Sequence, residues 1–151
     1  MIGLPRKTVF IDRNSGGRVF RDMLTESNIN TVLHDELFPP TTPDHIWLKK
    51  VGALGYAMVT ADIAVERSFL FLDGLKRSKS YVFILCGLNH ATRETRAKCI
   101  IDAYPEMLKL CCANPGPRLW KQKPLGKILE VNFRHTLGLL KREAKTGDIR
   151  M

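Results

Sequence analysis

The amino-acid sequence predicts an α/β fold with a mostly parallel sheet, because short apolar segments alternate with segments of helical periodicity. Apolar runs bounded by turn residues are typical of strands that are buried on both faces, as in parallel sheets. The predicted strands, the last of them a weaker candidate, lie at residues 7–12, 29–34, 56–60, 81–86 and 127–131. Parallel strands need crossover connections, so the intervening helices should cover the sheet.

The segments between these strands repeat apolar residues at helical spacing, which predicts amphipathic helices. Their apolar faces are formed by Val19, Phe20, Met23 and Leu24, by Trp47, Leu48, Val51 and Leu54, by Phe69, Leu70, Leu72 and Leu75, and by a set between residues 97 and 111. We expect Thr42 to be the N-cap of the second helix, with Pro43 as its first residue. Thr92 should cap the last helix, which Pro105 should kink or split.

Length and composition predict one domain. The chain has 151 residues, of which 44% are hydrophobic and 26% charged, as in ordinary globular proteins. We assign residues 1–140 to a single domain and expect the polar tail at residues 141–151 to fray. No apolar run approaches the roughly 18 residues of a membrane span, and the first residues do not read as a signal peptide. We therefore expect a cytoplasmic protein.

The cysteines show no spacing that is typical of a metal site. Cys86, Cys99, Cys111 and Cys112 form no C-x-x-C pair, and no histidine lies at zinc-finger distance from them. A structural zinc site is therefore not expected. We expect buried free thiols rather than disulfides, as in reduced cytosolic proteins.

The charge of the chain is strongly positive. It carries 24 Lys and Arg against 15 Asp and Glu, a formal net charge of +9. Such an excess favours a polyanionic partner, because lysine and arginine release counterions from phosphates when they bind. We expect nucleic acid, although a solubility surface or an acidic protein partner would account for the same charge.

Three aspartates lie where chemistry is expected in this fold. Asp12 ends the first predicted strand, Asp62 follows the third, and Asp44 lies in the first turn of the helix between them. Open parallel sheets bind ligands outside the carboxyl ends of their strands, so the three carboxylates should converge at one edge. Crowded carboxylates repel one another, which favours a hard divalent cation among them.

Each aspartate also has an ordinary explanation. Asp12 would form an Asx-turn, Asp44 would favour the helix dipole, and Asp62 would cap the next helix. Asp12 is the least easily explained in this way, because it ends an otherwise apolar strand.

The surroundings of these aspartates resemble the PIN-like domains of bacterial and archaeal toxin–antitoxin modules, in particular the VapC-like group. The resemblance covers residues 8–89. The segments that carry it are Phe10-Ile11-Asp12-Arg13-Asn14, Phe38-Pro39-Pro40, Thr42-Pro43-Asp44, Trp47, Gly55 and Val59-Thr60-Ala61-Asp62.

The resemblance implies a three-layer α/β/α sandwich with a mostly parallel central sheet. It implies that Asp12, Asp44 and Asp62 are the catalytic residues and hold Mg²⁺ or Mn²⁺. The resemblance therefore implies a metal-dependent endoribonuclease, which hydrolyses RNA phosphodiester bonds by metal-activated water. It also implies that this nuclease is the toxin of a toxin–antitoxin module. The implied partners are the RNA substrate, a cognate antitoxin protein and a second copy of the chain.

The sequence departs from the usual pattern of this group at two places. His45 follows Asp44, where relatives often carry an acidic residue, and the segment after Asp62 reads Ile63-Ala64-Val65-Glu66-Arg67 rather than basic. Glu66 lies four residues after Asp62 and would share its face of a helix. It would then either supply a fourth carboxylate to the metal or pair with a nearby cation.

Four further residues are candidates for substrate binding. Arg13 and Arg67 carry guanidinium groups that match phosphate oxygens. Asn14 and Asn89 lie in loops after the first and fourth strands, where an amide would orient a phosphate or a water. The ordinary alternatives are a turn for Asn14 and solvated positions for the arginines.

The main alternative to a nuclease is a catalytically weakened module of the same fold that binds nucleic acid or a protein. It follows from the resemblance, because PIN-like sites often have four acidic positions. Only three such positions are matched here by aspartates.

Overall fold

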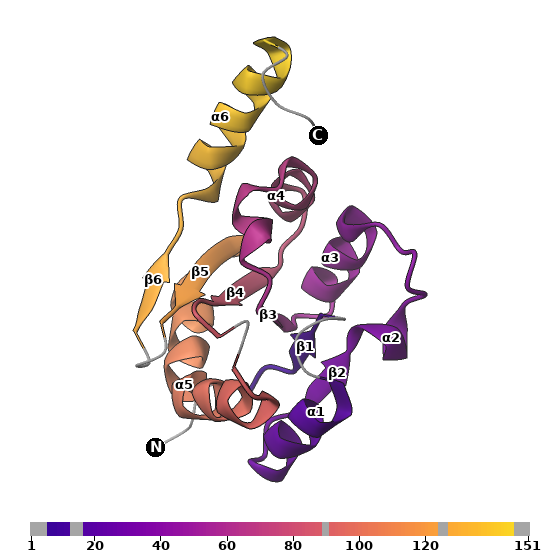
Figure 1. The fold of residues 1–151 in the computed structure, drawn as a ribbon, viewed down its shortest axis with the longest axis vertical. Helices are drawn as coiled ribbons and strands as arrows, with labels where there is room; N and C mark the ends of the chain where they lie inside the picture. The colour runs from indigo at the N-terminus through magenta and orange to yellow at the C-terminus, as the bar shows by residue number, and fades with distance from the viewer. Residues whose placement is uncertain (1–5, 13–16, 89–90, 124–126, 147–151) are drawn as a thin grey trace.

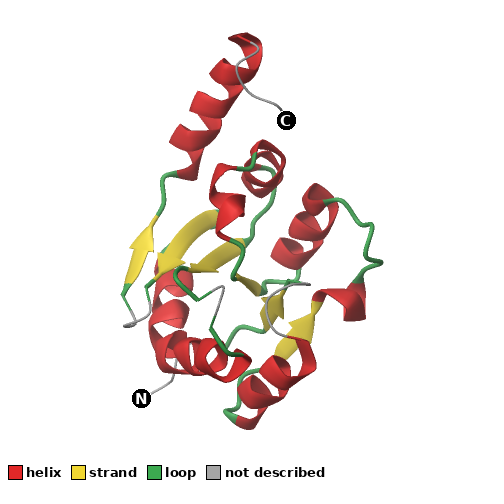
Figure 2. Ribbon diagram, in the orientation of Figure 1, coloured by secondary structure: helices red, strands yellow, loops and turns green. Residues whose placement is uncertain are grey.

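The computed structural model describes residues 6–12, 17–88, 91–123 and 127–146, and in these ranges a central sheet lies between two layers of helices (Figure 1, Figure 2). The strands are β1 (Val9–Ile11), β2 (Thr31–Leu33), β3 (Ala57–Thr60), β4 (Tyr81–Leu85), β5 (Arg118–Gln122) and β6 (Ile128–Glu130). Their order is β2-β1-β3-β4-β5-β6, and every neighbouring pair is parallel except β5 and β6. The predicted three-layer α/β/α fold is therefore confirmed.

The helices of the described ranges divide between the two faces of the sheet. They are α1 (Gly17–Glu26), α2 (His34–Leu37), α3 (Asp44–Ala53), the 3-10 helix η1 (Ile63–Arg67), α4 (Phe69–Lys76), α5 (Arg93–Ala113) and α6 (Phe133–Thr146). Buried residues of α1 and α5 form one core with the sheet, and buried residues of α3, α4 and α6 form the other. In Figure 1, α6 lies at the end of the molecule opposite α1.

Alternate residues of each strand enter opposite cores, as the period of a strand requires. In β1, Val9 and Ile11 face the layer of α1 and α5, whereas Phe10 faces the layer of α3 and α4. All three side chains are fully buried. Burial on both faces is the reason that this strand and its neighbours are continuous apolar runs in the sequence.

The start of α3 differs from the prediction by one residue. The N-cap is Pro43, and Asp44 rather than Pro43 is the first helical residue. The Thr42 hydroxyl does not cap the helix, because it donates instead to the carbonyl oxygen of Pro39 at 2.8 Å. This local turn competes with capping for the same hydroxyl. The prediction for Thr92 is confirmed, since its side chain accepts from the Thr95 amide.

Pro105 does not split α5, which is one helix from Arg93 to Ala113. A proline inside a helix removes one backbone hydrogen bond. The helix is held across this point by a continuous buried face, formed by Ala97, Ile100, Ala103, Tyr104, Met107 and Cys111. Neither α5 nor any other helix in the described ranges is long and apolar enough to cross a membrane.

Two elements at the end of the chain were not predicted. The strand β5 reads Arg-Leu-Trp-Lys-Gln and therefore shows no apolar run, although Gln122 at its end is fully buried. The helix α6 passes residue 140 and runs to Thr146, so it includes part of the tail that we expected to fray. Leu137 and Leu140 are buried in the core with α4, and Lys141 lies 3.9 Å from the Asp73 carboxylate.

The cysteines are free thiols, as predicted, but only two of them are buried. Cys99 and Cys111 are buried, Cys86 is half-buried and Cys112 is exposed. Burial raises the pKa of the Cys111 thiol to about 12 and also raises that of Cys99. The buried thiols therefore carry little of the reactive thiolate at neutral pH.

We expect iodoacetamide to modify Cys112 well before Cys111 in the native protein at about pH 8, near the pKa of a free thiol. Peptide mass spectrometry of samples taken over time measures the order of modification. The same reaction in concentrated urea is the control, because unfolding should make the two neighbouring cysteines react at similar rates. Equal rates in the native protein would contradict the burial of Cys111.

The Glu36 carboxylate joins α2 to β2 and α1. The Leu33 amide donates to Glu36 Oε1 at 2.9 Å, and Arg21 Nη1 lies 2.9 Å from Glu36 Oε2. The backbone hydrogen bond, followed by the Arg21 guanidinium, holds the pKa of Glu36 below its ordinary value of 4.5. Since the pKa is lower in the folded state, ionised Glu36 stabilises the fold above its ordinary pKa.

This stabilisation should disappear as the pH falls through the lowered pKa of Glu36. We expect Glu36→Gln to reduce the free energy of unfolding at neutral pH and to have a smaller effect in acid. Urea unfolding of both proteins from about pH 7 to about pH 3 measures the difference. A difference that stays constant over this range would contradict the assignment to the charged carboxylate.

Candidate metal centre

The three aspartates that the sequence singles out line one cavity of about 200 Å³. Asp12 follows β1, Asp62 lies two residues after the end of β3, and Asp44 is the first residue of α3. Because β1 and β3 are parallel neighbours, their carboxyl ends meet at the same edge of the sheet. The remaining walls are formed by His34, Pro40, Thr42, Trp47, Met58, Val65 and Phe71.

Thr60, the last residue of β3, links two of these aspartates. Its hydroxyl donates to Asp12 Oδ2 at 2.6 Å and accepts a hydrogen bond from the Asp62 amide at 3.0 Å. The Thr60 side chain is fully buried, so its hydroxyl has no access to bulk water and depends on these two partners. Thr60 therefore sets the orientation of the Asp12 carboxylate and the direction in which the chain leaves β3.

Asp44 and Asp62 are each held through a single carboxylate oxygen. Trp47 Nε1 donates to Asp44 Oδ1 at 3.1 Å, and the Ala64 amide donates to Asp62 Oδ1 at 3.0 Å. Asp62 is thus the N-cap of η1, as its ordinary explanation required. In the part of the chain that the structure describes, the Oδ2 atoms of Asp44 and Asp62 have no hydrogen-bond partner. Capping and ligand binding are therefore compatible at Asp62.

Packed aromatic rings support the side of the cavity that carries Asp44. The Trp47 ring stacks on Phe10 with centroids 5.6 Å apart, and the ring of His34 lies edge-on to Trp47 at 5.7 Å. Trp47 and His34 are buried, and Phe71 contacts Trp47 from α4 at 6.2 Å. This packing fixes the indole that donates to Asp44, so it also restricts the Asp44 carboxylate.

The chemistry of this donor set fits a hard divalent cation. Mg²⁺ and Mn²⁺ prefer oxygen ligands, and three carboxylates on one cavity supply them. Across the described ranges, however, no three side chains of His, Cys, Asp or Glu are gathered closely enough to form a ready-made metal site. The three carboxylates line the same cavity while each accepts a hydrogen bond from a different neighbour.

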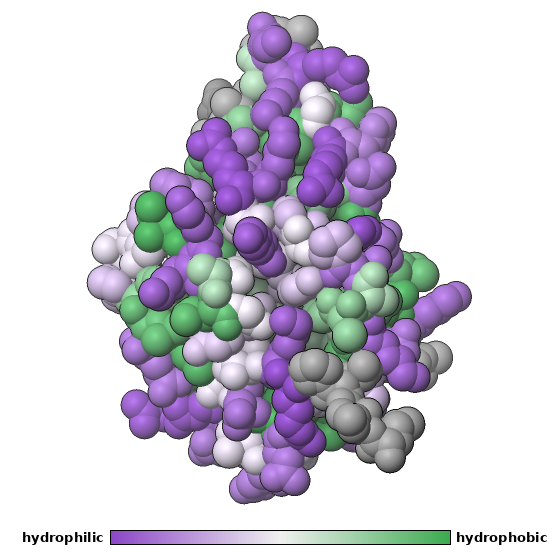
Figure 3. Space-filling model, turned by 180° about the vertical axis from the view of Figure 1, so that it is seen from behind, coloured by the Kyte–Doolittle hydropathy of each residue, from purple (hydrophilic) through white to green (hydrophobic). Residues whose placement is uncertain are grey.

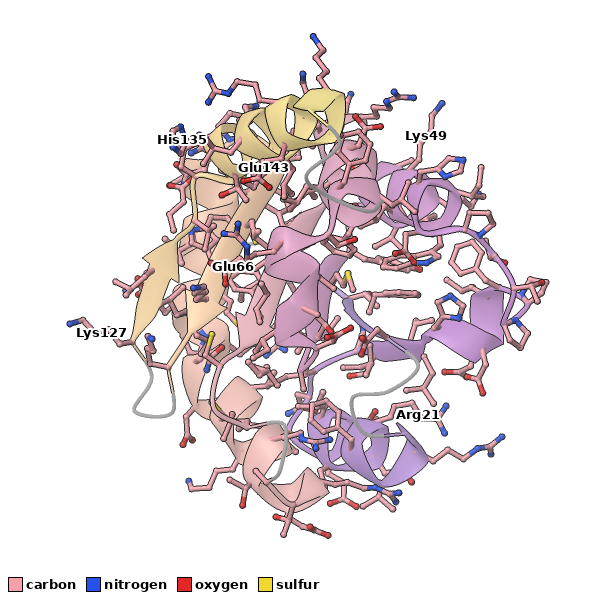
Figure 4. All side chains as sticks on the ribbon, turned by 45° about the horizontal axis from the view of Figure 1, so that its top comes forward. Arg21, Lys49, Glu66, Lys127, His135 and Glu143 are labelled. Carbon is pink, nitrogen blue, oxygen red and sulfur yellow. The ribbon has the colours of Figure 1, made fainter. Side chains whose placement is uncertain are left out.

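Glu66 is engaged by a cation. Lys121 Nζ of β5 lies 2.6 Å from Glu66 Oε1, and the exposed fractions of the two side chains are 30% and 26%. Glu66 itself is labelled in Figure 4. Glu66 is not among the residues that line the cavity of the three aspartates. Of the two roles considered for Glu66 from the sequence, the structure therefore shows the ion pair, and the pair fastens η1 to the sheet.

The predicted substrate-binding residues are placed only in part. Arg67 lies at the end of η1 and is exposed. Arg13, Asn14 and Asn89 lie outside the described residues. A second hollow of about 270 Å³ adjoins the cavity and shares Asp12, His34 and Pro40 with it; its other walls are Gly17, Arg18, Leu33 and Asp35.

Sequence reasoning missed the residues that position the aspartates. Thr60 stands two residues before Asp62, which was a usable signal, because a hydroxyl at the end of a strand can bond to the backbone two residues on. The roles of Trp47 and Lys121 had no comparable signal. Lys121 is 55 positions from its partner Glu66 in the sequence (121 minus 66).

The profile of the family described as PIN like domain matches residues 8–87. The chain belongs to the PIN-like domain family. No curated protein and no solved structure matched the chain. The matched region of this PIN-like domain runs from the residue before β1 to just after β4 and contains all three aspartates of the cavity. The fold is of a nuclease type, and PIN-like domains usually bind divalent metals.

We expect Thr60→Val to weaken the binding of Mn²⁺ to this PIN-like domain by about tenfold or more, the usual cost of losing a residue that orients metal ligands. The valine keeps the branched shape but lacks the hydroxyl that donates to Asp12 and accepts from the Asp62 amide. Isothermal titration calorimetry measures the affinity, and circular dichroism checks that the protein is folded.

Thr60→Ser is the matched control, because serine keeps the hydroxyl and loses only a methyl group. It should bind Mn²⁺ nearly as well as the wild type. Equal affinities for the valine and serine variants would show that the hydroxyl does not position the aspartates.

Proposed function

We propose that this PIN-like domain is a metal-dependent endoribonuclease that hydrolyses RNA phosphodiester bonds. The observation that carries the proposal is the shared cavity at the carboxyl edge of the sheet. Asp12, Asp44 and Asp62 line this cavity although they are far apart in the sequence. They belong to three different elements, so only the tertiary fold brings them to the same cavity. A formal net charge of +9 suits a polyanionic substrate.

In this proposal, Asp12, Asp44 and Asp62 hold Mg²⁺ or Mn²⁺. A bound ion of this kind activates water for attack on the phosphodiester and stabilises charge on the leaving oxygen. The chain contributes orientation: Thr60 holds Asp12, and Trp47 holds Asp44. Buried Met58 and Phe71 line the inner side of the cavity and exclude water there. Arg13, Asn14, Arg67 and Asn89 remain proposed substrate-binding residues.

We further propose that the nuclease is the toxin of a toxin–antitoxin pair in the cytoplasm. Support comes from the motifs that resemble the VapC-like group, above all Phe10-Ile11-Asp12 with Thr42-Pro43-Asp44. The proposed partners are a cognate antitoxin protein that covers the cavity and a second copy of the chain. A small reading frame for a DNA-binding protein beside the gene would support this role.

The second candidate is a module of the same fold that binds nucleic acid or protein without cutting it. The ion pair between Glu66 and Lys121 favours this candidate. Glu66 is the acidic residue nearest to Asp62 in the sequence, and because it pairs with Lys121 it has a structural role instead of binding the metal. Three aspartates then have to hold the metal without Glu66. The two candidates differ in whether RNA is cleaved.

We expect Asp12→Asn, Asp44→Asn and Asp62→Asn each to lower RNA cleavage in Mg²⁺ or Mn²⁺ by on the order of a hundredfold or more, because an amide is a much poorer ligand for these ions than a carboxylate. Cleavage of a labelled RNA on denaturing gels measures the effect. Asp102→Asn is the matched control, since Asp102 is exposed on α5 and pairs only with Lys98 in the described ranges.

The control should cleave RNA at the wild-type rate. If the wild type binds RNA but neither Mg²⁺ nor Mn²⁺ supports cleavage, the nuclease proposal fails and the binding module stands. If the Asp102 variant loses as much activity as the others, the assignment of the three aspartates fails.

A further inference from the structure

A basic hollow of about 340 Å³ lies at the edge of the sheet opposite the three aspartates. Its walls come from the end of α3 and from the turn between α4 and β4, and they are Lys49, Gly52, Ala53, Arg77, Ser78 and Lys79. The residues of both segments lead into the amino ends of the parallel strands β3 and β4. The aspartates lie at the carboxyl ends of β1 and β3, so α3 connects the two sites along its length.

The cations of this hollow have few counter-charges. Lys49 and Lys79 are exposed and form no ion pair in the described part of the chain, and the same holds for their neighbours Lys50 and Lys76. Arg77 pairs with Asp73 at 3.1 Å, but its side chain is 74% exposed. Figure 4 shows Lys49 extending outward from α3, and Figure 3 shows hydrophilic side chains over much of the back of the molecule.

The backbone of Lys79 is tightly packed between two glycines, Gly52 and Gly116. A Cβ atom on Gly52 would lie 2.9 Å from the Lys79 amide nitrogen, and one on Gly116 would lie closer still to the Lys79 carbonyl oxygen. The neighbouring Ser80 hydroxyl, which is fully buried, donates to the Leu48 carbonyl at 2.6 Å. The base of the hollow is therefore rigid, and only the ends of the cationic side chains have to be ordered when an anion binds.

Lys49 and Asp44 lie on the same helix, α3, but on different faces of it. Lys49 is five residues after Asp44, which is a rise of about 7.5 Å along the helix axis and a rotation of about 140° around it. Lys79 and Arg77 lie beyond it, beside the last turn of the same helix. A polymer of phosphates that curves around α3 can contact these three positive charges while another part of it lies at the aspartates, whereas a single small anion would occupy only one of the two sites.

We propose that the basic hollow binds backbone phosphates of the RNA strand whose scissile bond lies in the cavity of the aspartates. The inference rests on the proposed nuclease function and adds the kind of substrate: a strand long enough to pass along α3, rather than a dinucleotide. Lysine and arginine bind such a strand without reading its bases, by releasing counterions from its phosphates.

The test compares two triple variants that remove the same number of positive charges. One carries Lys49→Gln, Arg77→Gln and Lys79→Gln in the hollow. The control carries Lys98→Gln, Lys109→Gln and Lys127→Gln, which lie on α5 and beside β6 and are exposed. Fluorescence anisotropy with a labelled single-stranded RNA oligonucleotide measures binding across a salt series in EDTA, so that no cleavage occurs.

We expect the hollow variant to bind RNA on the order of tenfold more weakly and its salt slope to fall by about two, since each phosphate that a cation neutralises on a single strand adds roughly 0.7 to the slope. The control variant should bind like the wild type. Thermal unfolding checks that both variants are folded, because lysines near helix ends also stabilise the helix dipole.

Equal weakening in the two triple variants would overturn the proposal, because the attraction would then come from net charge alone. Unchanged binding in the hollow variant, or no RNA binding by the wild type at low salt, would also overturn it. Cleavage of a dinucleotide in Mn²⁺ separates the two proposals, since the hollow variant should cleave it at the wild-type rate. If the wild type cleaves neither substrate but the difference in RNA binding remains, the nuclease function fails and the binding site stands.

Discussion

The parallel pairing of β1 with β3 is the constraint on which the candidate site depends. Ile11 lies opposite Val59 in the register, so Asp12 and Thr60 come next on the two strands. The Thr60 hydroxyl then joins the Asp12 carboxylate to the Asp62 amide at the point where both chains leave the sheet. A shift of register by one residue would reverse the sides of all side chains on one strand and separate these groups. The cavity is thus a consequence of sheet geometry, and its carboxylates need no contact with one another.

Two further interactions hold the elements that surround this edge. The stacked rings of Phe10 and Trp47 fix α3 against the sheet and keep the indole in place to donate to Asp44. The ion pair between Glu66 and Lys121 fastens η1, which starts immediately after Asp62, to β5. Each of the two links lies between segments far apart in the sequence. The first positions Asp44 through the Trp47 indole, which donates to it, and the second positions Asp62 only through the helix η1 that follows it.

The strands β3 and β4 were predicted most clearly because their environment is apolar on both faces, so every residue carries the same signal. The predicted strand at residues 127–131, the weaker candidate, is present as β6 although two of its three residues are exposed. The strand β5 was not predicted because polar residues interrupt its apolar pattern. These polar residues are accommodated in the sheet because each has a partner on a distant segment. Gln122 donates to the Cys99 carbonyl of α5 at 2.9 Å, and Lys121 pairs with Glu66. A sequence pattern records hydrophobicity and spacing, but it does not record which polar group is paired across the fold. The same limit applies to Thr42, whose hydroxyl bonds back to Pro39 instead of capping α3.

The sequence by itself determined the α/β class and the placement of Asp12 and Asp62 beyond strand ends, because strand periodicity and apolar runs are local properties of the chain. It also determined that the protein is strongly basic. Only the tertiary structure decided that Asp44 lines the same cavity, that Thr60 holds Asp12, and that Glu66 is paired with Lys121. It likewise brought Lys49 and Lys79 to one hollow. These facts depend on which helix packs on which strand, and such long-range contacts are set by the summed burial of many side chains rather than by any short stretch of sequence.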